Sequence, residues 1–523
     1  MRIFFIICIW SVLLADIAHA QLAQNLFIGN PKALSLGNSV TADPPGVDSI
    51  HFNPAGLSKL PYNTRDIKVI TGDISIEGEF TRNDRYRELE ATLGTEDPYA
   101  DRKSELDSAA AYLPVFGLTD LPVLLAALGG VAYVAPGGDV TFATAAYAPL
   151  LLGFSRDDDD AGVLYNKSLG LSRITYFSPT VAWRISDSFA VGVGIGFSFA
   201  GIGMEHTVRL PQAKLGAAYS GVNLLCDGTN IEDYVNICEG SLNPFLPIFD
   251  INVDLKENFS TTFNLGLLWD VTPWLTLWLV YQSSASDELE GDINIKLADQ
   301  IGSFITGLAE SGPVLDAFVR SQDLVPGSDY SIDRKASFVF ELPQHIAFGV
   351  STLVFPDLRI NIDVKWTEMS AWDEWIIEFD EPIKVLGLLE TPISNANRFR
   401  IPRGYEDTLD WSLGVEYRVN DALSVRAGYE PRSSGIPKDK RDFLIPIGDS
   451  TLYSVGGSYR MTRESVIELA LGYLSSEEYI PAGSSTNGND PDQESHGINP
   501  SAGLDVTTRF SAIMLELSYQ TRF

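Results

Sequence analysis

Leu358-Arg359-Ile360-Asn361-Ile362-Asp363-Val364-Lys365-Trp366 is the stretch in which the fold of this chain is plainest. Apolar and polar side chains exchange at every step, which is the period of a β-strand with one apolar and one polar face. The same alternation recurs in residues 191–199, 411–419 and 467–473. The pattern predicts an all-β protein, although period two alone fits a soluble sandwich as well as a membrane barrel.

Acidic residues dominate the charge of the chain. Its 523 residues carry 69 Asp and Glu against 37 Lys and Arg, which gives a formal net charge of −32. A partner with a phosphate backbone needs clustered cations, so this balance argues against nucleic acid. The mean hydropathy of +0.04 is too high for a disordered acidic protein. The chain therefore buries a large apolar surface.

The first 20 residues have the pattern of a secretory signal peptide. Arg2 precedes an apolar stretch from Ile3 to Ala15, and Ala18-His19-Ala20 is a small-x-small cleavage site. We expect cleavage after Ala20, because the apolar run is shorter than the ~20 residues of a retained membrane anchor. The mature chain then keeps Cys226 and Cys238, which either form a disulfide in an oxidising compartment or are two unpaired thiols in a polar loop.

Three features favour a transmembrane barrel in the outer membrane of a Gram-negative-type bacterium. The predicted strands run for about 9–11 residues, which suffices to cross a bilayer at a tilt. The last segment, Ile513 to Phe523, alternates and ends on an aromatic residue, like the signal read by the barrel assembly machinery. Aromatic residues also mark the ends of the apolar stripes, as interface girdles require: Trp269, Trp274, Tyr281, Trp366, Trp411, Tyr429 and Tyr473.

Long polar stretches separate about a dozen clear strands. They cover residues 83–106, 209–250, 287–333 and 475–501, and they alternate with short turns such as Asn420-Asp421. This asymmetry predicts long extracellular loops and short periplasmic turns. The acidic loops would face lipopolysaccharide, with divalent cations bridging the two sets of anions. Within the third loop, Ile301 to Val319 predicts a short amphipathic helix at the barrel mouth.

No catalytic or metal-binding pattern stands out in the chain. The mature histidines, His51, His206, His345 and His496, have no ligand spacing, and no Gly-x-Ser-x-Gly turn accompanies them. We therefore predict no enzyme, no cofactor and no metal. Asp157 to Asp160 and Asn489 to Asp492 supply oxygen ligands that a calcium ion could use, but they follow no calcium-loop pattern. Solvated acidic loops are the better interpretation.

Residues 21–62 are too rich in Pro and Gly to form a spanning strand. They include Gly29-Asn30-Pro31, the segment Gly37 to Gly46, and Phe52-Asn53-Pro54-Ala55-Gly56-Leu57. They are nevertheless apolar. A compact irregular plug inside the barrel, here called the hatch, satisfies both properties, because its polar backbone can bond to the lumen wall. Residues 63–523 then form the barrel.

The chain resembles the FadL/TodX family of outer-membrane transporters for long-chain fatty acids and aromatic hydrocarbons. The resemblance is colinear over nearly the whole mature chain. It rests on Leu36-Gly37-Asn38, Asn53-Pro54-Ala55-Gly56, Tyr147-Ala148-Pro149, Asn264 to Trp269, Leu342-Pro343, Val364 to Ser370, Arg426 to Tyr429, Ile436-Pro437 and Phe523. It implies a fourteen-stranded barrel, a hatch, an apolar ligand pocket, and release of the ligand sideways through a gap in the wall.

The resemblance also assigns residues to the lateral opening. Pro149 and Gly153 interrupt an apolar strand, which either opens the wall as in the family or is a bulge without function. Gly266 faces the lumen and matches a glycine of the family. Because glycine has no side chain, Gly266 either keeps a passage clear or packs as a small residue against the hatch.

A fatty acid needs a cation for its carboxylate. The basic pocket residues of the family fall near Arg209, Arg400 and Arg403, whereas Glu406-Asp407 stands where fatty-acid members tend to carry Lys before Asp. We therefore expect a transporter of hydrophobic compounds, with long-chain fatty acids first. Aromatic hydrocarbon uptake, a structural or adhesive surface barrel, and a general porin are the alternatives.

Overall fold

The computed structural model describes residues 28–523 except 107, 122–123, 210–242, 244, 328, 389–393, 491–500 and 502. The expected signal peptide, Cys226 and Cys238 lie outside the described residues. Neighbouring strands are antiparallel, and β1 pairs with β23 from Thr64↔Arg522 to Thr81↔Asp505, so the sheet closes on itself. The fold expected from the alternation is confirmed: the chain forms a closed barrel of 14 strands.

The wall is continuous at the end with short turns. In order around the barrel it consists of β1 (Thr64–Thr81), β5 (Leu124–Val134), β6 (Val140–Ser155), β8 (Thr180–Ser186), β9 (Phe189–Val208), β10 (Phe249–Thr272), β11 (Leu275–Gln282), β14 (His345–Phe355), β15 (Leu358–Thr367), β19 (Thr408–Arg418), β20 (Leu423–Arg432), β21 (Ser450–Arg460), β22 (Ser465–Ile480) and β23 (Asp505–Arg522).

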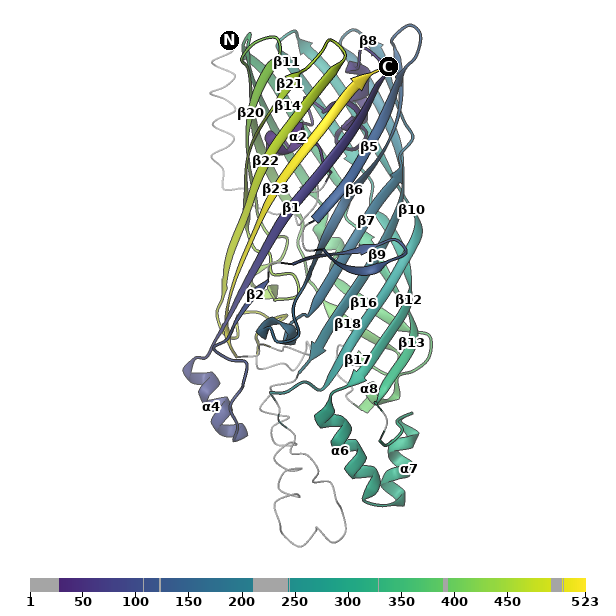
Figure 1. The fold of residues 1–523 in the computed structure, drawn as a ribbon, viewed down its shortest axis with the longest axis vertical. Helices are drawn as coiled ribbons and strands as arrows, with labels where there is room; N and C mark the ends of the chain where they lie inside the picture. The colour runs from purple at the N-terminus through teal and green to yellow at the C-terminus, as the bar shows by residue number, and fades with distance from the viewer. Residues whose placement is uncertain are drawn as a thin grey trace.

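Shorter elements extend the wall at the other end, where the loops and helices gather (Figure 1). The strands there are β2 (Lys103–Leu106), β3 (Ala109–Leu113), β4 (Gly117–Leu121), β7 (Ser168–Phe177), β12 (Ala285–Leu297), β13 (Ser331–Leu342), β16 (Glu374–Phe379), β17 (Ser394–Asn395) and β18 (Arg398–Pro402). The helices are α4 (Asp84–Leu93), η3 (Ala161–Leu164), α6 (Asp299–Glu310), α7 (Pro313–Ser321), η4 (Met369–Ala371), α8 (Lys384–Leu388) and η5 (Lys438–Lys440).

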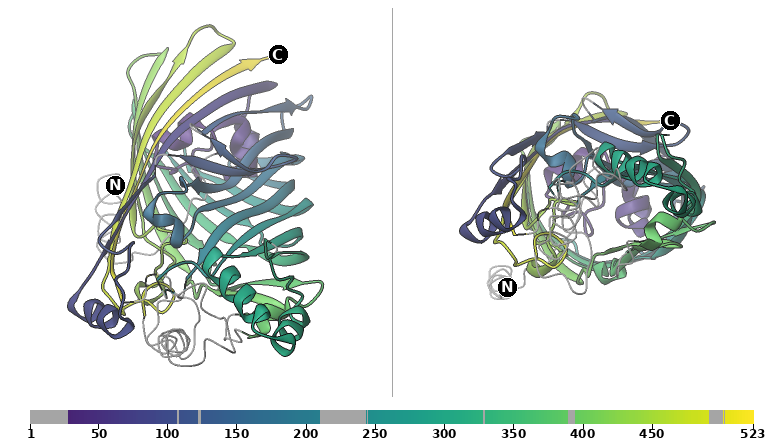
Figure 2. Two further views of the ribbon diagram at one scale, coloured as in Figure 1. Left: turned by 60° about the horizontal axis from the view of Figure 1, so that its bottom comes forward. Right: turned by 90° about the horizontal axis from the view of Figure 1, so that it is seen from below.

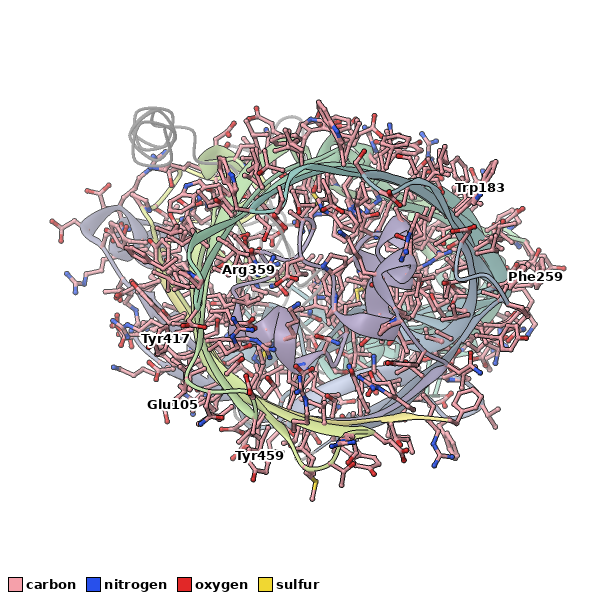
Figure 3. All side chains as sticks on the ribbon, turned by 90° about the horizontal axis from the view of Figure 1, so that it is seen from above. Glu105, Trp183, Phe259, Arg359, Tyr417 and Tyr459 are labelled. Carbon is pink, nitrogen blue, oxygen red and sulfur yellow. The ribbon has the colours of Figure 1, made fainter. Side chains whose placement is uncertain are left out.

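Side chains on the outside of the barrel form the apolar belt that a bilayer requires. Trp183, Phe259, Tyr417 and Tyr459 point away from the ring in Figure 3, and each is at least half exposed. Arg359, from the opening stretch of β15, points into the lumen in the same view. Asp363 on that strand is buried and accepts a hydrogen bond from the hatch, whereas Val364 is exposed. The alternation therefore separates lumen from lipid as predicted.

Several strands are longer than the 9–11 residues expected. β9 has 20 residues and β10 has 24, and the predicted loops at 287–333 and 475–501 begin as strand, because β12 continues to Leu297 and β22 to Ile480. Polar residues such as Asn252 and Asn294 still pair across the ladder there. Water can solvate their side chains above a membrane, so the wall continues beyond the length that hydropathy indicates.

The helix expected over 301–319 is two helices, α6 and α7. The break falls at Gly312, whose φ is +156°, followed by Pro313 at the first position of α7. Proline lacks the N–H that would continue a helix, and it suits a helix start. Among the described residues, none of the helices is long and apolar enough to cross a membrane.

Short helical turns before β1 fill the lumen (Figure 2). They are α2 (Pro31–Ser35), η1 (Gly46–Asp48), α3 (Ser49–Phe52) and η2 (Pro54–Lys59). Ile28, Leu36, Val40, Val47 and Ile50 form one buried cluster with Ala143, Ala145 and Tyr147 of β6. This segment occupies the place expected for the hatch.

Candidate functional site

The Asn53-Pro54-Ala55-Gly56 motif builds the last turn of the hatch. Asn53 caps η2, since its Oδ1 accepts the Ala55 N–H at 3.0 Å, and Pro54 takes the first position of the turn. The Asn53 amide donates to the Thr41 carbonyl at 3.3 Å. A Cβ on Gly56 would lie 2.2 Å from Pro44 Cγ, so only glycine fits there. The motif thus fixes the hatch to itself.

Lumen-facing glycines let the hatch approach the wall closely. A Cβ on Gly192 of β9 would lie 2.3 Å from the Ala55 nitrogen, and one on Gly266 of β10 would lie 2.0 Å from Asn53 Oδ1. Gly266 faces the lumen as predicted, and in the structure it packs against the hatch. Its role in the lateral opening stays a prediction that the geometry does not favour.

Buried polar contacts join the hatch to the barrel. Asp48 accepts hydrogen bonds from Lys68 of β1 at 2.6 Å and from Asn30 at 2.6 Å, and all three side chains are buried. Asn38 donates to Glu430 at 2.8 Å, and the Thr41 N–H donates to Asp363 at 2.7 Å. Since a buried charge is costly without a partner, these contacts hold the hatch in one orientation.

Strand β6 is irregular at Pro149. Its pairing with β7 shifts between Tyr147 and Leu150, as expected for a residue that cannot donate to the ladder. On the opposite edge, pairing with β5 ends at Gly129↔Ala146, and the next pair is Ala109↔Phe154. Within the described residues, the edge of β6 between these two pairs lacks a strand partner. This unpaired edge, residues 147–153, is where a lateral opening would form.

A cavity lies between the hatch and the bulge. It is lined by His51 of the hatch together with Tyr147, Pro149, Arg173, Thr175, Thr262, Asn264, Gln282, Ser283, Leu342, Pro343 and His345. Most of these groups are polar, so this cavity differs from the apolar pocket expected. Arg173 is fully buried and is paired with Asp287 and Ser260. Sequence reasoning missed Arg173, although its inward position in an otherwise apolar strand was a usable signal.

Gly153 faces the outside of the barrel. The shift at Pro149 brings Leu150 opposite the lumen-facing Arg173, so Gly153 lies opposite Gly170 on the outer face. A Cβ on Gly153 would lie 2.2 Å from the Ala110 carbonyl oxygen of β3. The assignment of Gly153 to the opening stays a prediction, and in the structure Gly153 contacts β3 on the outer face of the wall.

Arg209 is engaged within the loops. Its Nη1 donates to both Asp97 oxygens at 2.9 and 3.0 Å, and its Nη2 donates to the Tyr165 hydroxyl at 3.0 Å. Burial disfavours its charge, but Tyr165 and Asp97 outweigh burial and place the pKa of Arg209 above its ordinary value. Because its carboxylate partner is internal, Arg209 fastens the loop that contains α4 to the end of β9.

Arg400 and Arg403 are close in sequence but differ in environment. Arg400 pairs with Glu374, and its side chain is 40% exposed. It shares a face with Ile376, whereas Trp375 and Phe399 on the other face are buried. Arg403 is fully buried and pairs with Asp442. Of the two, only Arg403 lies in an apolar interior.

Five aromatic residues, called here the aromatic cluster, pack against one another beside Arg403. They are Phe338, Phe340, Trp372, Trp375 and Tyr405, and all are buried. The guanidinium carbon lies 5.4 Å from the ring centres of both Trp375 and Tyr405. Within the described residues, Nε and Nη1 of Arg403 and Nε1 of Trp375 have no partner in hydrogen-bond geometry, although the Tyr405 hydroxyl lies beside the guanidinium. Buried donors usually have a hydrogen-bond acceptor, so these nitrogens are candidates to bind one.

Arg403 remains a cation. Burial disfavours its charge, but the Asp442 carboxylate outweighs burial and raises the pKa of Arg403 above its ordinary value. Glu406 and Asp407, the departure from the fatty-acid pattern, are exposed, and Asp407 accepts a hydrogen bond from Ser370. Neither carboxylate therefore lines the aromatic cluster.

The two acidic stretches make local contacts. Asp160 accepts hydrogen bonds from the Ser104 hydroxyl and the Gly162 N–H, each at 2.6 Å, and Lys167 holds the pKa of Asp158 below its ordinary value. Asn489 donates to the Pro481 and Leu504 carbonyls, each at 2.9 Å. Over the described ranges, no group of three or more His, Cys, Asp or Glu side chains is placed to hold a metal ion.

A hatched barrel with an apolar belt and buried cations is the arrangement of an outer-membrane transport protein. The family model described as outer membrane protein transport protein (OMPP1/FadL/TodX) matches residues 12–523, and the chain belongs to this family. Its members are transport channels of the outer membrane for hydrophobic compounds, and the chain is an outer-membrane protein.

Curated relatives are distant. The chain is 21% identical over 247 residues to an outer membrane protein of Neisseria meningitidis serogroup B, which covers 47% of the chain and 48% of that protein. It is 22% identical over 356 residues to outer membrane protein P1 of Haemophilus influenzae, and this alignment covers 65% of the chain and 64% of that protein. The match thus spans about half to two thirds of the length of these relatives.

Solved structures show the same fold at low identity. A FadL homologue of Pseudomonas aeruginosa aligns with a TM-score of 0.65 at 16% identity, over 96% of this chain and 99% of that one. The toluene transporter TbuX of Ralstonia pickettii aligns with a TM-score of 0.59 at 14% identity, over 95% and 99% of the two chains.

Proposed function

We propose that this protein carries long-chain fatty acids across the outer membrane. In this proposal Arg403 receives the carboxylate, the acyl chain lies along the buried apolar residues below it, and the lipid leaves sideways into the membrane beside Pro149. The observation that carries the proposal is a fully buried arginine beside the aromatic cluster with two donor nitrogens, Nε and Nη1, that have no hydrogen-bond partner.

The chemistry of Arg403 suits an amphipathic acid. A guanidinium in a low-dielectric pocket binds a carboxylate through charge-assisted hydrogen bonds, which are about twice as strong as neutral ones. Asp442 accepts from Nη2 and leaves Nε and Nη1 for the ligand. Met369, Ile377, Phe399 and Ile436 belong to the same buried apolar core as the aromatic cluster. Each buried CH₂ of an acyl chain adds about 0.8 kcal/mol.

The bulge at Pro149 supports sideways release. The unpaired edge of β6 includes Pro149, and Pro149 also lines the cavity next to the hatch. Hatch residues fill the lumen below, so a straight path to the periplasm is occupied. A long apolar chain gains nothing from crossing a water-filled pore, and a route into the membrane keeps it out of water.

A neutral aromatic hydrocarbon is the second candidate. Asp442 already pairs with Arg403, and the edge-to-face ring pairs Phe338–Trp375 and Trp372–Trp375 show contacts that an aromatic ligand could extend. One of the structurally similar proteins is the toluene transporter TbuX of Ralstonia pickettii. A structural or adhesive barrel would instead hold no lipid. Mass spectrometry of lipids that co-purify with the folded protein distinguishes this alternative.

The test compares oleate with methyl oleate in binding to the purified protein. Native protein should bind oleate at least tenfold more tightly, because only the acid pairs with Arg403. Arg403→Leu should remove this preference and leave methyl oleate binding within about twofold. Arg400→Leu is the matched control and should bind both ligands like the native protein. Equal binding of the two ligands to native protein overturns the carboxylate site, and preferential binding of toluene favours the second candidate.

A further inference from the structure

A β-hairpin lies on the outside of the barrel wall next to the bulge at Pro149. It consists of β3 and β4, which pair from Ala109↔Leu121 to Leu113↔Gly117. In Figure 1 it crosses the outer face of β7 and β9. Nothing in the family resemblance or the alternation predicted this element.

The alternation on β7 and β9 shows that the hairpin is outside. Arg173 and Thr175 of β7 line the lumen cavity, so Gly170 and Ser172 face outward. Gly192 of β9 touches the hatch, so the odd-numbered Gly201 and Gly203 face outward. A Cβ on Gly201 would lie 2.2 Å from Tyr112 Cδ1, and one on Gly203 would lie 2.7 Å from Leu118 Cβ.

Three glycines in register form the surface that the hairpin covers. Gly153 of β6 pairs with Gly170 of β7, and Gly170 pairs with Gly203 of β9. A Cβ on Gly170 would lie 2.9 Å from the Tyr112 nitrogen. A side chain at Gly153 or Gly170, where the added Cβ would meet hairpin backbone, would lift the hairpin from the wall.

Few polar contacts fasten the hairpin. The Tyr112 N–H donates to Ser172 Oγ at 3.1 Å, and the Tyr112 hydroxyl donates to Asp254 of β10, the residue that pairs with Gly203. The tip projects freely, since Val115 is 91% exposed and Phe116 is 77% exposed. Val115 also has a φ of +73°, which a β-branched residue rarely adopts.

The base of the hairpin frames the unpaired edge of β6. Ala109 pairs with Phe154, and the Ser155 N–H donates to the Ser108 carbonyl at 3.3 Å. At the other side of the hairpin, β4 ends at Leu121 and β5 begins at Leu124. The hairpin therefore joins the strand on one side of the break in the wall to the strand on the other.

We propose that the hairpin β3–β4 is an external latch on the lateral opening. Seated on the glycine row, it holds β5 and β6 together above Pro149. Lifted, it frees the Ala109↔Phe154 pair and widens the break, so that the acyl chain passes into the outer leaflet. The latch rests on the sideways release proposed above, and Tyr112 and Leu118 are its positioning residues.

A disulfide between the hairpin and the wall tests the latch. Leu118→Cys with Gly203→Cys, in a Cys226→Ser/Cys238→Ser background, places the two sulfurs in reach after a shift of roughly 1 Å. The oxidised protein, preloaded with labelled oleate in lipid vesicles, should release it to the bilayer at least tenfold more slowly. Its affinity for oleate should stay within twofold of native, and reduction should restore release. Native release from the oxidised protein overturns the latch.

Tyr112→Phe supplies the opposite change. It removes only the hydroxyl contact with Asp254, so release should become about two- to fivefold faster. Tyr176→Phe is the control, because its hydroxyl lies on the same outer face and donates to the Asn258 carbonyl at 3.4 Å. Equal release from Tyr112→Phe and Tyr176→Phe overturns the latch, including the case in which the disulfide does not form.

A ligand-free measurement separates this inference from the proposed function. Spin labels at Phe116→Cys and Phe259→Cys, in the same cysteine-free background, report the distance from the hairpin tip to the wall. A latch gives two distances, and Tyr112→Phe increases the longer population. One unchanged distance in both proteins overturns the latch, whereas failure of native protein to bind oleate overturns the fatty-acid function alone.

Discussion

Glycines carry close packing on both faces of this barrel wall, but the two contacts differ in strength. On the lumen face, Gly192 and Gly266 receive the hatch. On the outer face, the glycine row receives the hairpin. Backbone and side chain approach to within van der Waals contact in both places, so shape complementarity is common to them.

Buried charge is what distinguishes the two contacts. The hatch adds the Lys68–Asp48 pair, the bond from Asn38 to Glu430 and the bond from Thr41 to Asp363. Apart from the backbone contacts at its base, the hairpin adds two hydrogen bonds from one residue, Tyr112. Losing half of a buried ion pair costs far more than losing one hydroxyl bond. The same glycine packing thus supports a fixed hatch on the lumen face and, in our proposal, a movable latch on the outer face.

The largest expected effect is at the buried pair of the hatch. Lys68→Met leaves Asp48 buried with only Asn30 as partner and should lower the free energy of unfolding by about 3–5 kcal/mol. Urea unfolding in lipid vesicles measures it. Lys59→Met is the control: its partner Asp270 is at the surface and its side chain is 47% exposed, so the loss should stay below about 1 kcal/mol. Equal losses would contradict the contrast, and adding Asp48→Asn to Lys68→Met should recover most of the stability.

A smaller effect is expected from the packing alone. Gly192→Ala inserts a methyl group 2.3 Å from hatch backbone and should cost about 1–3 kcal/mol. Gly196→Ala, four residues further along the same face of β9, meets the Thr262 hydroxyl at 2.9 Å and has its other neighbours at 3.5 Å or more, and the Thr262 side chain can rotate. Thermal midpoints of the two variants decide the matter. Similar midpoints would mean that the hatch shifts to accommodate the methyl group at position 192, and would contradict the close packing of hatch and wall.

The smallest effect concerns the tip of the hairpin. Val115→Gly removes the strain of a positive φ, about 1–2 kcal/mol, against a glycine entropy cost of about 0.5–1 kcal/mol. The net gain should slow hydrogen exchange at the Tyr112 amide by about twofold. Phe116→Ser leaves the strained residue in place and should leave the exchange rate unchanged. Faster exchange in Val115→Gly would show that Val115 itself holds the tip.

Much of the fold was predictable from the sequence, because a strand with one apolar environment and one polar environment has apolar and polar residues in alternation. The lumen positions of Asp363 and Gly266 and the plugged lumen were predictable in this way. Strand ends were not, since the extensions of β10 and β12 rely on ladder hydrogen bonds that polar residues make as well as apolar ones. The hairpin β3–β4, residues 109–121, gave no signal, because the surface that it packs on consists of glycines on three other strands.

The candidate site divides along the same line. The hatch motif was identifiable, as Asn53 and Pro54 act within one turn of local structure. The fates of the three arginines depended on distant partners: Asp97 for Arg209, Glu374 for Arg400 and Asp442 for Arg403. Only the folded chain separates the buried arginine whose donors remain available from Arg209, which is engaged, and Arg400, which is partly exposed.

The seam between β1 and β23 sets an order of events for assembly. Its ladder joins Thr64 to Arg522 and continues to Thr81↔Asp505, so it forms between the most distant strands of the chain. Contacts of such separation form late, because the intervening chain must first be ordered. The hatch precedes β1 and is enclosed by the finished ring. We therefore expect the hatch to enter the curved, still open sheet before β1 and β23 pair, so that closure of the barrel also encloses the plug.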